Sequence, residues 1–213
     1  MSISAVLFDV DGTLVDSNYH HTLAWSRALR AHGHRVPLFV VHRLIGMGGS
    51  ELLEKLIGHP DATVEESWRR HFDELLPEVF AFDGAGALLH AVHERGATIV
   101  LATSSPQDLL SEMRARIDAD EAIHDVVTSG DADRAKPHPD IFEIALEKSG
   151  ALRDDAVVVG DSVWDVGAAT KARLQCIALE SGGYSRGELE AAGAHVVYRD
   201  PNDLRARLAE WMR

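Results

Sequence analysis

The sequence predicts an α/β fold: a mainly parallel sheet with helices on both faces and a small α-helical cap inserted after the first strand. Two observations support this prediction. Short apolar runs alternate with helical patterns over residues 84–211, which is typical of parallel strands joined by helices. Between the first apolar run and Phe82 the alternation stops, and the patterns there are helical only.

The first strand is expected at residues 3–8, because this run is too short for a normal helix and is rich in apolar side chains. Such runs are typical of strands buried on both faces, as in parallel sheets. Five later segments have the same character and are expected as strands, at residues 97–101, 125–128, 156–159, 176–179 and 195–198.

One helix between these strands is expected at residues 139–148, where Pro139 occupies a first helical position and Gly150 acts as a stop signal. The insertion has helical patterns at residues 19–31, 50–57 and 64–80. Trp25 and Trp68 lie at apolar positions of these patterns, so we expect them in a core.

These patterns divide the chain into two predicted domains. Residues 1–17 and 83–213 would form the α/β core domain, and residues 18–82 a helical cap domain. Both ends of the cap would meet the carboxyl edge of the sheet. We therefore expect the cap to act as a lid over that edge.

The composition is that of a globular protein, with 213 residues, 46% of them apolar, and a formal net charge of −13. This charge argues against binding to nucleic acid or anionic membranes, which need basic patches. No segment approaches the roughly 18 apolar residues of a membrane span, and no signal-peptide pattern is present, so we expect a cytoplasmic protein. The single cysteine, Cys176, excludes an internal disulfide and is expected in the core, while the oligomeric state is left open.

Two carboxylates, Asp9 and Asp11, follow the first strand one residue apart, and so leave the sheet at its carboxyl edge. Ligands bind at that edge in open α/β sheets. Gly12 allows a sharp turn there, and neighbouring carboxylates repel each other unless a cation or proton lies between them. An ordinary Asp-Gly turn is the alternative, but the pair suits a cation site.

Three further groups of polar residues follow later strands at the same edge. They are Thr103 with Ser104, Lys136, and Asp161 with Asp165. Each group has an ordinary alternative: a hydroxyl after a strand is often a helix N-cap, a loop lysine is usually solvated, and the Gly-Asp-Ser segment at Asp161 can be a turn. Because a parallel sheet brings its strand ends into one crevice, we expect a hydroxyl, an ammonium and at least three carboxylates to converge there.

Such a set meets the needs of phosphoryl transfer: a nucleophile, a cation that offsets negative charge, donors to the phosphoryl oxygens and an acid for the leaving group. Carboxylate oxygens favour Mg²⁺ as the metal. The histidines do not have zinc-site spacing, because His20 and His21 are adjacent and His32 and His34 lie beside a glycine turn.

The motifs resemble those of the haloacid dehalogenase superfamily, specifically its phosphatase branch, which carries a helical cap on a Rossmann-like core. The resemblance covers almost the whole chain, with four motifs in the family's order: residues 9–13, Thr103, Lys136 and residues 160–165. It implies that Asp9 is the nucleophile, which forms an aspartyl-phosphate. Asp11 would be the general acid, and then the base for the attacking water.

The resemblance also implies how substrate and metal are held. Thr103 and Lys136 would bind the phosphoryl group, with Ser104 as a neighbouring substrate contact. The implied Mg²⁺ ligands are the Asp9 carboxylate, the Asp11 backbone carbonyl and Asp161, with Asp165 either a ligand through water or a partner of the ligands.

Within the superfamily, dehalogenases and phosphonate hydrolases lack the Asp that matches Asp11, whereas sugar-phosphate mutases with the same cap keep both carboxylates. Residues 11–17 look more like the phosphoglycolate phosphatase type. Residues 42–50 resemble the substrate-specificity region of the cap, where Arg43 could meet an anionic group; a surface helix position is the alternative for Arg43.

The implied activity is a Mg²⁺-dependent phosphatase for small phosphate monoesters, phosphoglycolate- or sugar-phosphate-like, acting through an aspartyl-phosphate. The alternative is a phosphosugar mutase of the β-phosphoglucomutase type. Alternatives from another class are a non-enzymatic phosphoacceptor, such as a response-regulator receiver domain, and a binding protein. A receiver domain would lack the helical insertion and the motif at residues 160–165, and a binding protein would be expected to have lost a motif residue.

Overall fold

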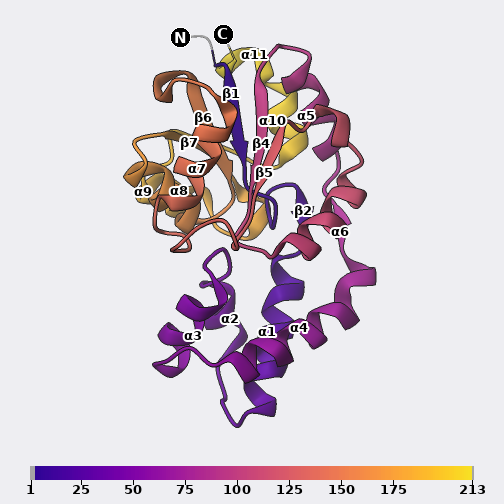
Figure 1. Ribbon diagram of the computed structural model, residues 1–213, viewed down its shortest axis with the longest axis vertical. Helices are drawn as coiled ribbons and strands as arrows, with labels where there is room; N and C mark the ends of the chain where they lie inside the picture. The colour runs from indigo at the N-terminus through magenta and orange to yellow at the C-terminus, as the bar shows by residue number, and fades with distance from the viewer. Residues whose placement is uncertain (1–2, 213) are drawn as a thin grey trace.

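The computed structural model describes residues 3–212 of the chain, and its larger lobe is built on a six-stranded sheet (Figure 1). Every neighbouring pair in this sheet is parallel. In spatial order the strands are β5 (Asp125–Val127), β4 (Thr98–Ala102), β1 (Ala5–Phe8), β6 (Ala156–Gly160), β7 (Gln175–Leu179) and β8 (Val196–Tyr198). All six expected strands are present, with small shifts at their ends, and the α/β fold class is confirmed.

The central strand β1 is buried on both faces, as its apolar composition predicted. Val6 and Phe8 belong to one apolar cluster, and Ala5 and Leu7 belong to the other. Phe8 lies opposite β4 on one side and β6 on the other. Because these three strands end at the same level, the loops that follow them meet at one edge of the sheet.

Helices cover both faces of the sheet (Figure 1). One face contacts α5 (Ala85–His93), α6 (Gln107–Ile117), α10 (Pro201–Ala206) and α11 (Leu208–Trp211). The other contacts α7 (Asp140–Ser149), α8 (Val163–Lys171) and α9 (Arg186–Ala192). Single 3-10 turns lie at Asp120–Ala122, Arg153–Asp155 and Glu180–Gly182. The expected helix at residues 139–148 is α7, and Gly150 ends it in a left-handed conformation.

The smaller, lower lobe in Figure 1 is a helical insertion that follows β1 in the chain and precedes α5. Its helices are α1 (Asn18–Ala31), α2 (Leu38–His42), α3 (Gly49–Ile57) and α4 (Ala62–Leu75). It has an apolar cluster of its own, which includes Trp25, Leu29, Leu52, Leu53 and Val64, with Trp68 packed against it. The insertion is also joined to the sheet, because Ala24, Phe72 and Leu75 belong to the apolar cluster on one sheet face.

One expectation for the insertion was wrong, and one short helix had not been predicted. The helix expected at residues 64–80 ends at Leu75, and a 3-10 turn follows at Leu76–Glu78. Pro77 explains the break, because proline has no backbone N–H to donate to the carbonyl four residues earlier. The short helix α2 had not been predicted, since it has only 5 residues.

A two-stranded antiparallel ladder joins the two lobes. It pairs β2 (Val15–Asp16), which precedes the insertion, with β3 (Phe80–Ala81) at its end. Strands of two residues show no hydrophobic alternation, so the sequence did not reveal them.

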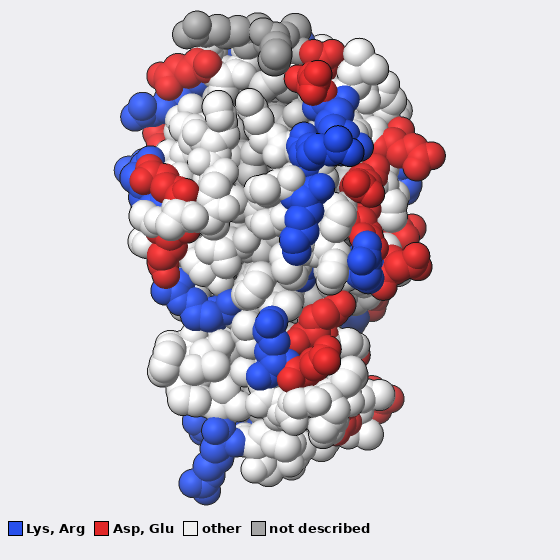
Figure 2. Space-filling view, turned by 90° about the vertical axis from the view of Figure 1, so that its left-hand side faces the viewer, with Lys and Arg blue, Asp and Glu red and all other residues white. Residues whose placement is uncertain are grey.

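Uncharged side chains cover much of the face drawn in Figure 2. On the face drawn in Figure 2, Lys and Arg side chains are interspersed with Asp and Glu side chains. None of the helices formed by residues 3–212 has the length and apolar character needed to cross a bilayer.

Candidate active site

The buried ammonium of Lys136 is the centre of the site. Its Nζ lies 2.5 Å from Oδ1 of Asp9 and 2.8 Å from Oδ1 of Asp165, and it donates to the backbone carbonyl of Ala102 at 3.1 Å. Lys136 has no exposed surface. The lysine therefore joins the loop after β1, the end of β4 and the start of α8, as convergence at the sheet edge predicts.

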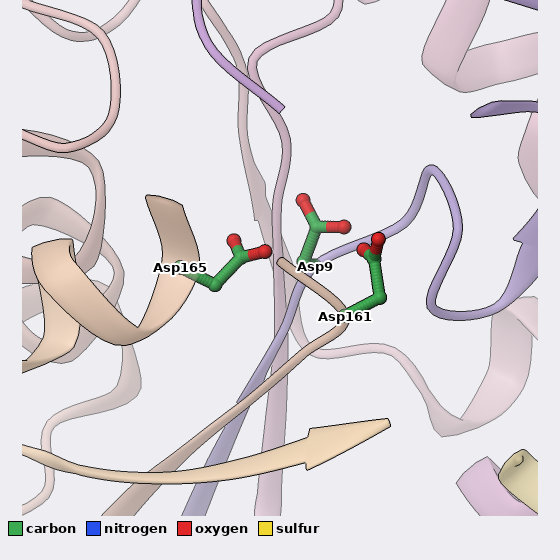
Figure 3. A group of neighbouring side chains, drawn as sticks. All are labelled: Asp9, Asp161 and Asp165. Atoms are coloured by element: carbon green, nitrogen blue, oxygen red, sulfur yellow. The ribbon is translucent and has the colours of Figure 1, made fainter. Parts of the chain in front are cut away.

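Three carboxylates face one another beside this lysine (Figure 3). One oxygen from each of Asp9, Asp161 and Asp165 lies within 4.8 Å of the other two. Asp9 follows β1, Asp161 follows β6, and Asp165 lies in the first turn of α8. The sequence had suggested Asp9 and Asp11 as a cation pair, and the family resemblance had implied Asp161 and Asp165 as further ligands or partners; of the side chains, Asp9, Asp161 and Asp165 lie together.

Hydrogen bonds fix the orientation of Asp161. Thr13 Oγ1 donates to Oδ1 of Asp161 at 3.0 Å and to Oδ2 of Asp9 at 3.1 Å. Asn18 Nδ2 donates to Oδ2 of Asp161 at 2.9 Å. The backbone of Gly182 packs directly on this carboxylate: a Cβ there would lie 1.6 Å from Oδ2, so only glycine fits.

Asp165 has a second, structural role. Its Oδ2 accepts hydrogen bonds from the backbone N–H and the hydroxyl of Ser162, at 3.1 Å and 2.5 Å. Ser162 in turn accepts from the backbone N–H of Asp165, which completes a capping box at the start of α8. The helix cap thus holds Asp165 in place beside Lys136.

The acidic cluster carries more negative charge than the lysine can balance. Burial and the charges of Asp165 and Asp11 outweigh Lys136 and raise the pKa of Asp9 to about 7. Burial, together with Asp165 and Asp9, raises the pKa of Asp161 well above its usual range. The same carboxylates outweigh burial at Lys136 and raise its pKa, so it stays charged.

The excess of negative charge in the cluster indicates that a metal cation fits there. Buried carboxylates that face one another need a proton or a cation between them. The donors are carboxylate oxygens from three elements, and hard oxygen donors suit a hard divalent cation such as Mg²⁺. The residues therefore fit the metal site that the sequence predicted. Asp11 adds no side-chain oxygen to the cluster.

The Asp11 carboxylate is held by four side chains instead. Oδ1 contacts Ser17 Oγ at 2.7 Å and His21 Nε2 at 3.0 Å. Oδ2 accepts from Thr103 Oγ1 at 3.1 Å and Ser105 Oγ at 2.8 Å. Burial would raise the pKa of Asp11, but the charge of His21 and these hydrogen bonds outweigh burial and lower it below its usual range.

A cavity of about 480 Å³ lies over these carboxylates, between the core and the helical insertion. Asp9, Asp11 and residues 103–106 line it from the core. His21, Trp25, residues 45–52, Glu65 and Trp68 line it from the insertion. Trp25 is buried in the core of the insertion, as expected, and both tryptophans also face this cavity.

Ser104 and Arg43 had both been expected to contact the substrate, and only Ser104 lines the cavity. Ser104 lines the cavity, and its Oγ donates to the backbone carbonyl of Gly46 in the insertion at 3.3 Å. Arg43 is not among the described residues that line the cavity. Its guanidinium pairs with Glu188 at 2.6 Å and lies 4.8 Å from the centre of the Tyr184 ring.

Several residues of the site had no predicted role. They are the residues that hydrogen-bond the carboxylates of Asp9, Asp11 and Asp161, namely Thr13, Ser17, Asn18, His21 and Ser105. Four of them lie within residues 13–21, directly after the Asp pair. Their closeness to this pair in the sequence is the signal from which they could have been predicted. The histidines had been considered only as zinc ligands.

The chain matches the haloacid dehalogenase-like hydrolase family over residues 3–173 and belongs to it. It is 27% identical to a validoxylamine A 7'-phosphate phosphatase of Streptomyces hygroscopicus subsp. limoneus, over 93% of this chain and 94% of that protein. It is 30% identical to a phosphoglycolate phosphatase of Rhodospirillum rubrum, over 98% of this chain and 90% of that protein.

A similar solved structure is a hydrolase from Pseudomonas syringae. It has a TM-score of 0.93 and 36% sequence identity, and the match covers 99% of this chain and 100% of that one. The resemblance drawn from the sequence motifs is confirmed, and the protein is a hydrolase of this family.

Proposed function

We propose that the protein is a Mg²⁺-dependent phosphatase that hydrolyses small phosphate monoesters through an aspartyl-phosphate. The observation that supports this most directly is the position of Asp9. Its carboxylate contacts the buried ammonium of Lys136, belongs to the acidic cluster and lines the cavity together with Asp11. The names of the relatives, which are phosphatases of phosphate monoesters, agree with this activity.

In the first step a carboxylate oxygen of Asp9 attacks phosphorus, and the bond from phosphorus to the ester oxygen breaks. Asp11 gives a proton to the departing oxygen, which leaves as an alcohol. Lys136 offsets negative charge on the nucleophile and the transferring group. The bound metal would supply further charge neutralisation, held by Asp9, Asp161 and Asp165.

In the second step water attacks the aspartyl-phosphate. Asp11 takes a proton from this water, the bond between phosphorus and Asp9 breaks, and inorganic phosphate leaves. Thr103 and Ser105 hold the Asp11 carboxylate throughout. The lowered pKa of Asp11 in the substrate-free site suits the second step, because it keeps the carboxylate ionised and able to accept a proton. The first step needs protonated Asp11, and the negative charge of a phosphate ester bound beside it would raise this pKa.

The helical insertion acts in this proposal as a mobile cap. Its residues line the cavity opposite Asp9, so movement about the β2–β3 ladder would open the cavity to substrate and close it for reaction. A closed cap excludes water and strengthens the interactions of Lys136 with the transferring group. The cytoplasmic location and the absence of nucleic-acid partners stay predictions from the sequence.

The test is release of inorganic phosphate from an aryl phosphate with and without Mg²⁺. We expect many turnovers per enzyme, dependent on Mg²⁺ and absent in Asp9→Asn. Release of no more than one phosphate per protein would indicate a phosphoacceptor. Conversion of a sugar 1-phosphate into its 6-phosphate without phosphate release would indicate a mutase. Either result would contradict the proposal.

A further inference from the structure

Apart from His21, the described residues that line the active-site cavity are acidic or uncharged, and none is Lys or Arg. Besides the catalytic pair, three carboxylates line it: Glu51, Glu65 and Asp133. Glu51 accepts a hydrogen bond from the backbone N–H of Ala135 at 3.3 Å. Glu65 accepts one from the hydroxyl of Ser50 at 2.9 Å. Neither donor is a cationic side chain, so neither hydrogen bond neutralises the negative charge of Glu51 or Glu65.

The basic side chains near the cavity are engaged elsewhere. Lys136 contacts Asp9 and Asp165, where it serves the transferring phosphoryl group. Arg43 pairs with Glu188. Arg69, one turn beyond Glu65 on α4, pairs with both Asp73 and Asp108, at 2.8 Å and 2.6 Å. A substrate with a second anionic group would therefore meet carboxylates without a cation to offset them.

The insertion offers instead an aromatic surface beside a carboxylate. The rings of Trp25 and Trp68 are stacked, with centroids 5.0 Å apart and planes 15° apart, and both line the cavity. Glu65 precedes Trp68 by three residues on α4, so the two share a helix face. An aromatic face binds the C–H surface of a polyol or a cation, and a carboxylate accepts hydrogen bonds from hydroxyl or ammonium groups.

We propose, on the basis of the phosphatase activity proposed above, that the preferred substrates are phosphate esters of polyols or amino-polyols with no second anionic group. Glu65 is the residue that determines this specificity. It attracts hydroxyl and ammonium groups of the leaving group and repels carboxylates and phosphates. The same charge distribution disfavours a mutase, which must hold a sugar with a phosphate at each end.

Matched esters test this proposal. The first set has two-carbon leaving groups: 2-hydroxyethyl phosphate, O-phosphoethanolamine and phosphoglycolate. The second has hexose leaving groups: the 1-phosphates of glucose, glucosamine and glucuronic acid. Within the hexose set we expect the neutral and cationic esters to exceed the anionic ester in kcat/KM by about tenfold or more, and the two-carbon set to show the same order.

A pair of variants on α4 assigns the effect to Glu65. In Glu65→Gln the charge is lost but the shape and the contact with Ser50 are kept, so the cationic-to-anionic ratio of kcat/KM should fall by about fivefold or more. Glu66→Gln removes the same charge at an exposed neighbour outside the cavity lining, and should keep the ratio within about twofold. Ratios taken within one variant cancel any general change in activity.

The outcomes separate the two proposals. If an aryl phosphate is hydrolysed but the anionic hexose ester is preferred or equal, only the specificity proposal fails. It also fails if Glu65→Gln leaves the ratio unchanged. If no ester is hydrolysed, the aryl phosphate included, the phosphatase assignment fails and the specificity proposal fails with it.

Discussion

His21 Nε2 lies 3.0 Å from Oδ1 of Asp11, so a side chain of the helical insertion contacts the second carboxylate of the core motif. The imidazole is 5% exposed and stacks on the Phe72 ring, with centroids 4.0 Å apart. Movement of the insertion away from the core would therefore remove a hydrogen-bonding partner from Asp11. The position of the insertion and the protonation of Asp11 are linked through this contact.

Replacing His21 tests this link. His21→Gln removes the imidazole whose charge and hydrogen bond lower the pKa of Asp11, so that pKa rises. Because Asp11 acts as the acid in the first step, the basic limb of the kcat/KM profile, which reports this acid, should move to higher pH. We also expect kcat to fall by about tenfold or more, because the acid and base roles of Asp11 are disturbed. Initial rates over a pH series measure both effects. His20→Gln on the same helix is the control, and a basic limb shared by both variants and the wild type would contradict the link.

Asp9→Asn should abolish turnover while the fold is retained. The amide is a poor nucleophile toward phosphorus and cannot form the aspartyl-phosphate. Phosphate release from an aryl phosphate measures activity, and far-ultraviolet circular dichroism checks the fold. Asp154→Asn, at an exposed position in a 3-10 turn, is the control for the loss of one charge. Hydrolysis by the Asp9 variant at near wild-type rate would rule out Asp9 as the nucleophile.

We expect the free energy of unfolding to depend on pH because of the acidic cluster. The pKa of Asp9 is raised from 3.8 to about 7, so in this interval the metal-free folded protein holds a proton that the unfolded chain has released. The contribution of Asp9 to the free energy of unfolding therefore falls as the pH rises between these two pKa values, by up to about 1.4 kcal/mol per pH unit.

Mg²⁺ should counter this loss, because the cation replaces the proton between the carboxylates. We expect Mg²⁺ to raise the melting temperature more at about pH 8 than at about pH 5. Thermal unfolding with and without Mg²⁺ measures the effect. Asp9→Asn should show a smaller Mg²⁺ effect and a flatter pH dependence. An equal increase at both pH values would indicate that no proton is displaced.

Lys136→Met should destabilise the protein by about 3–5 kcal/mol, because it leaves Asp9 and Asp165 buried without their cationic partner. Denaturant unfolding measures this loss, and kcat/KM should fall strongly with it. Lys171→Met is the control, since Lys171 is exposed and donates only to a backbone carbonyl. If the two variants have the same stability, Lys136 does not balance the cluster.

The sequence predicted the sheet well because burial on both faces imposes continuous apolar runs. In β6 all five residues are buried, and the run is visible in the chain as Val157, Val158 and Val159. The convergence of Asp9, Lys136, Asp161 and Asp165 also followed from the sequence, since parallel strands place their ends at one edge.

Contacts between the lobes could not be predicted in the same way. Arg43 had the right charge to bind an anion, but the direction of its side chain depends on Glu188 and Tyr184, which lie more than 140 residues later in the chain. The link from His21 to Asp11 likewise depends on how α1 leaves the β2–β3 ladder. Periodicity and motifs describe neighbours in the sequence, and these contacts join distant segments.

The β2–β3 ladder also has a consequence for how the family can diversify. Val15 and Ala81 are paired neighbours, so the chain leaves and rejoins the core at nearly one point. Asp9, Lys136, Asp161 and Asp165 all belong to the core, so a different insertion would leave this cluster in place. A different insertion would, however, remove Ser17 and His21 from Asp11 and Asn18 from Asp161, and would have to supply new partners for both carboxylates. It would also have to replace Phe72 and Leu75, which pack in the apolar cluster on the sheet.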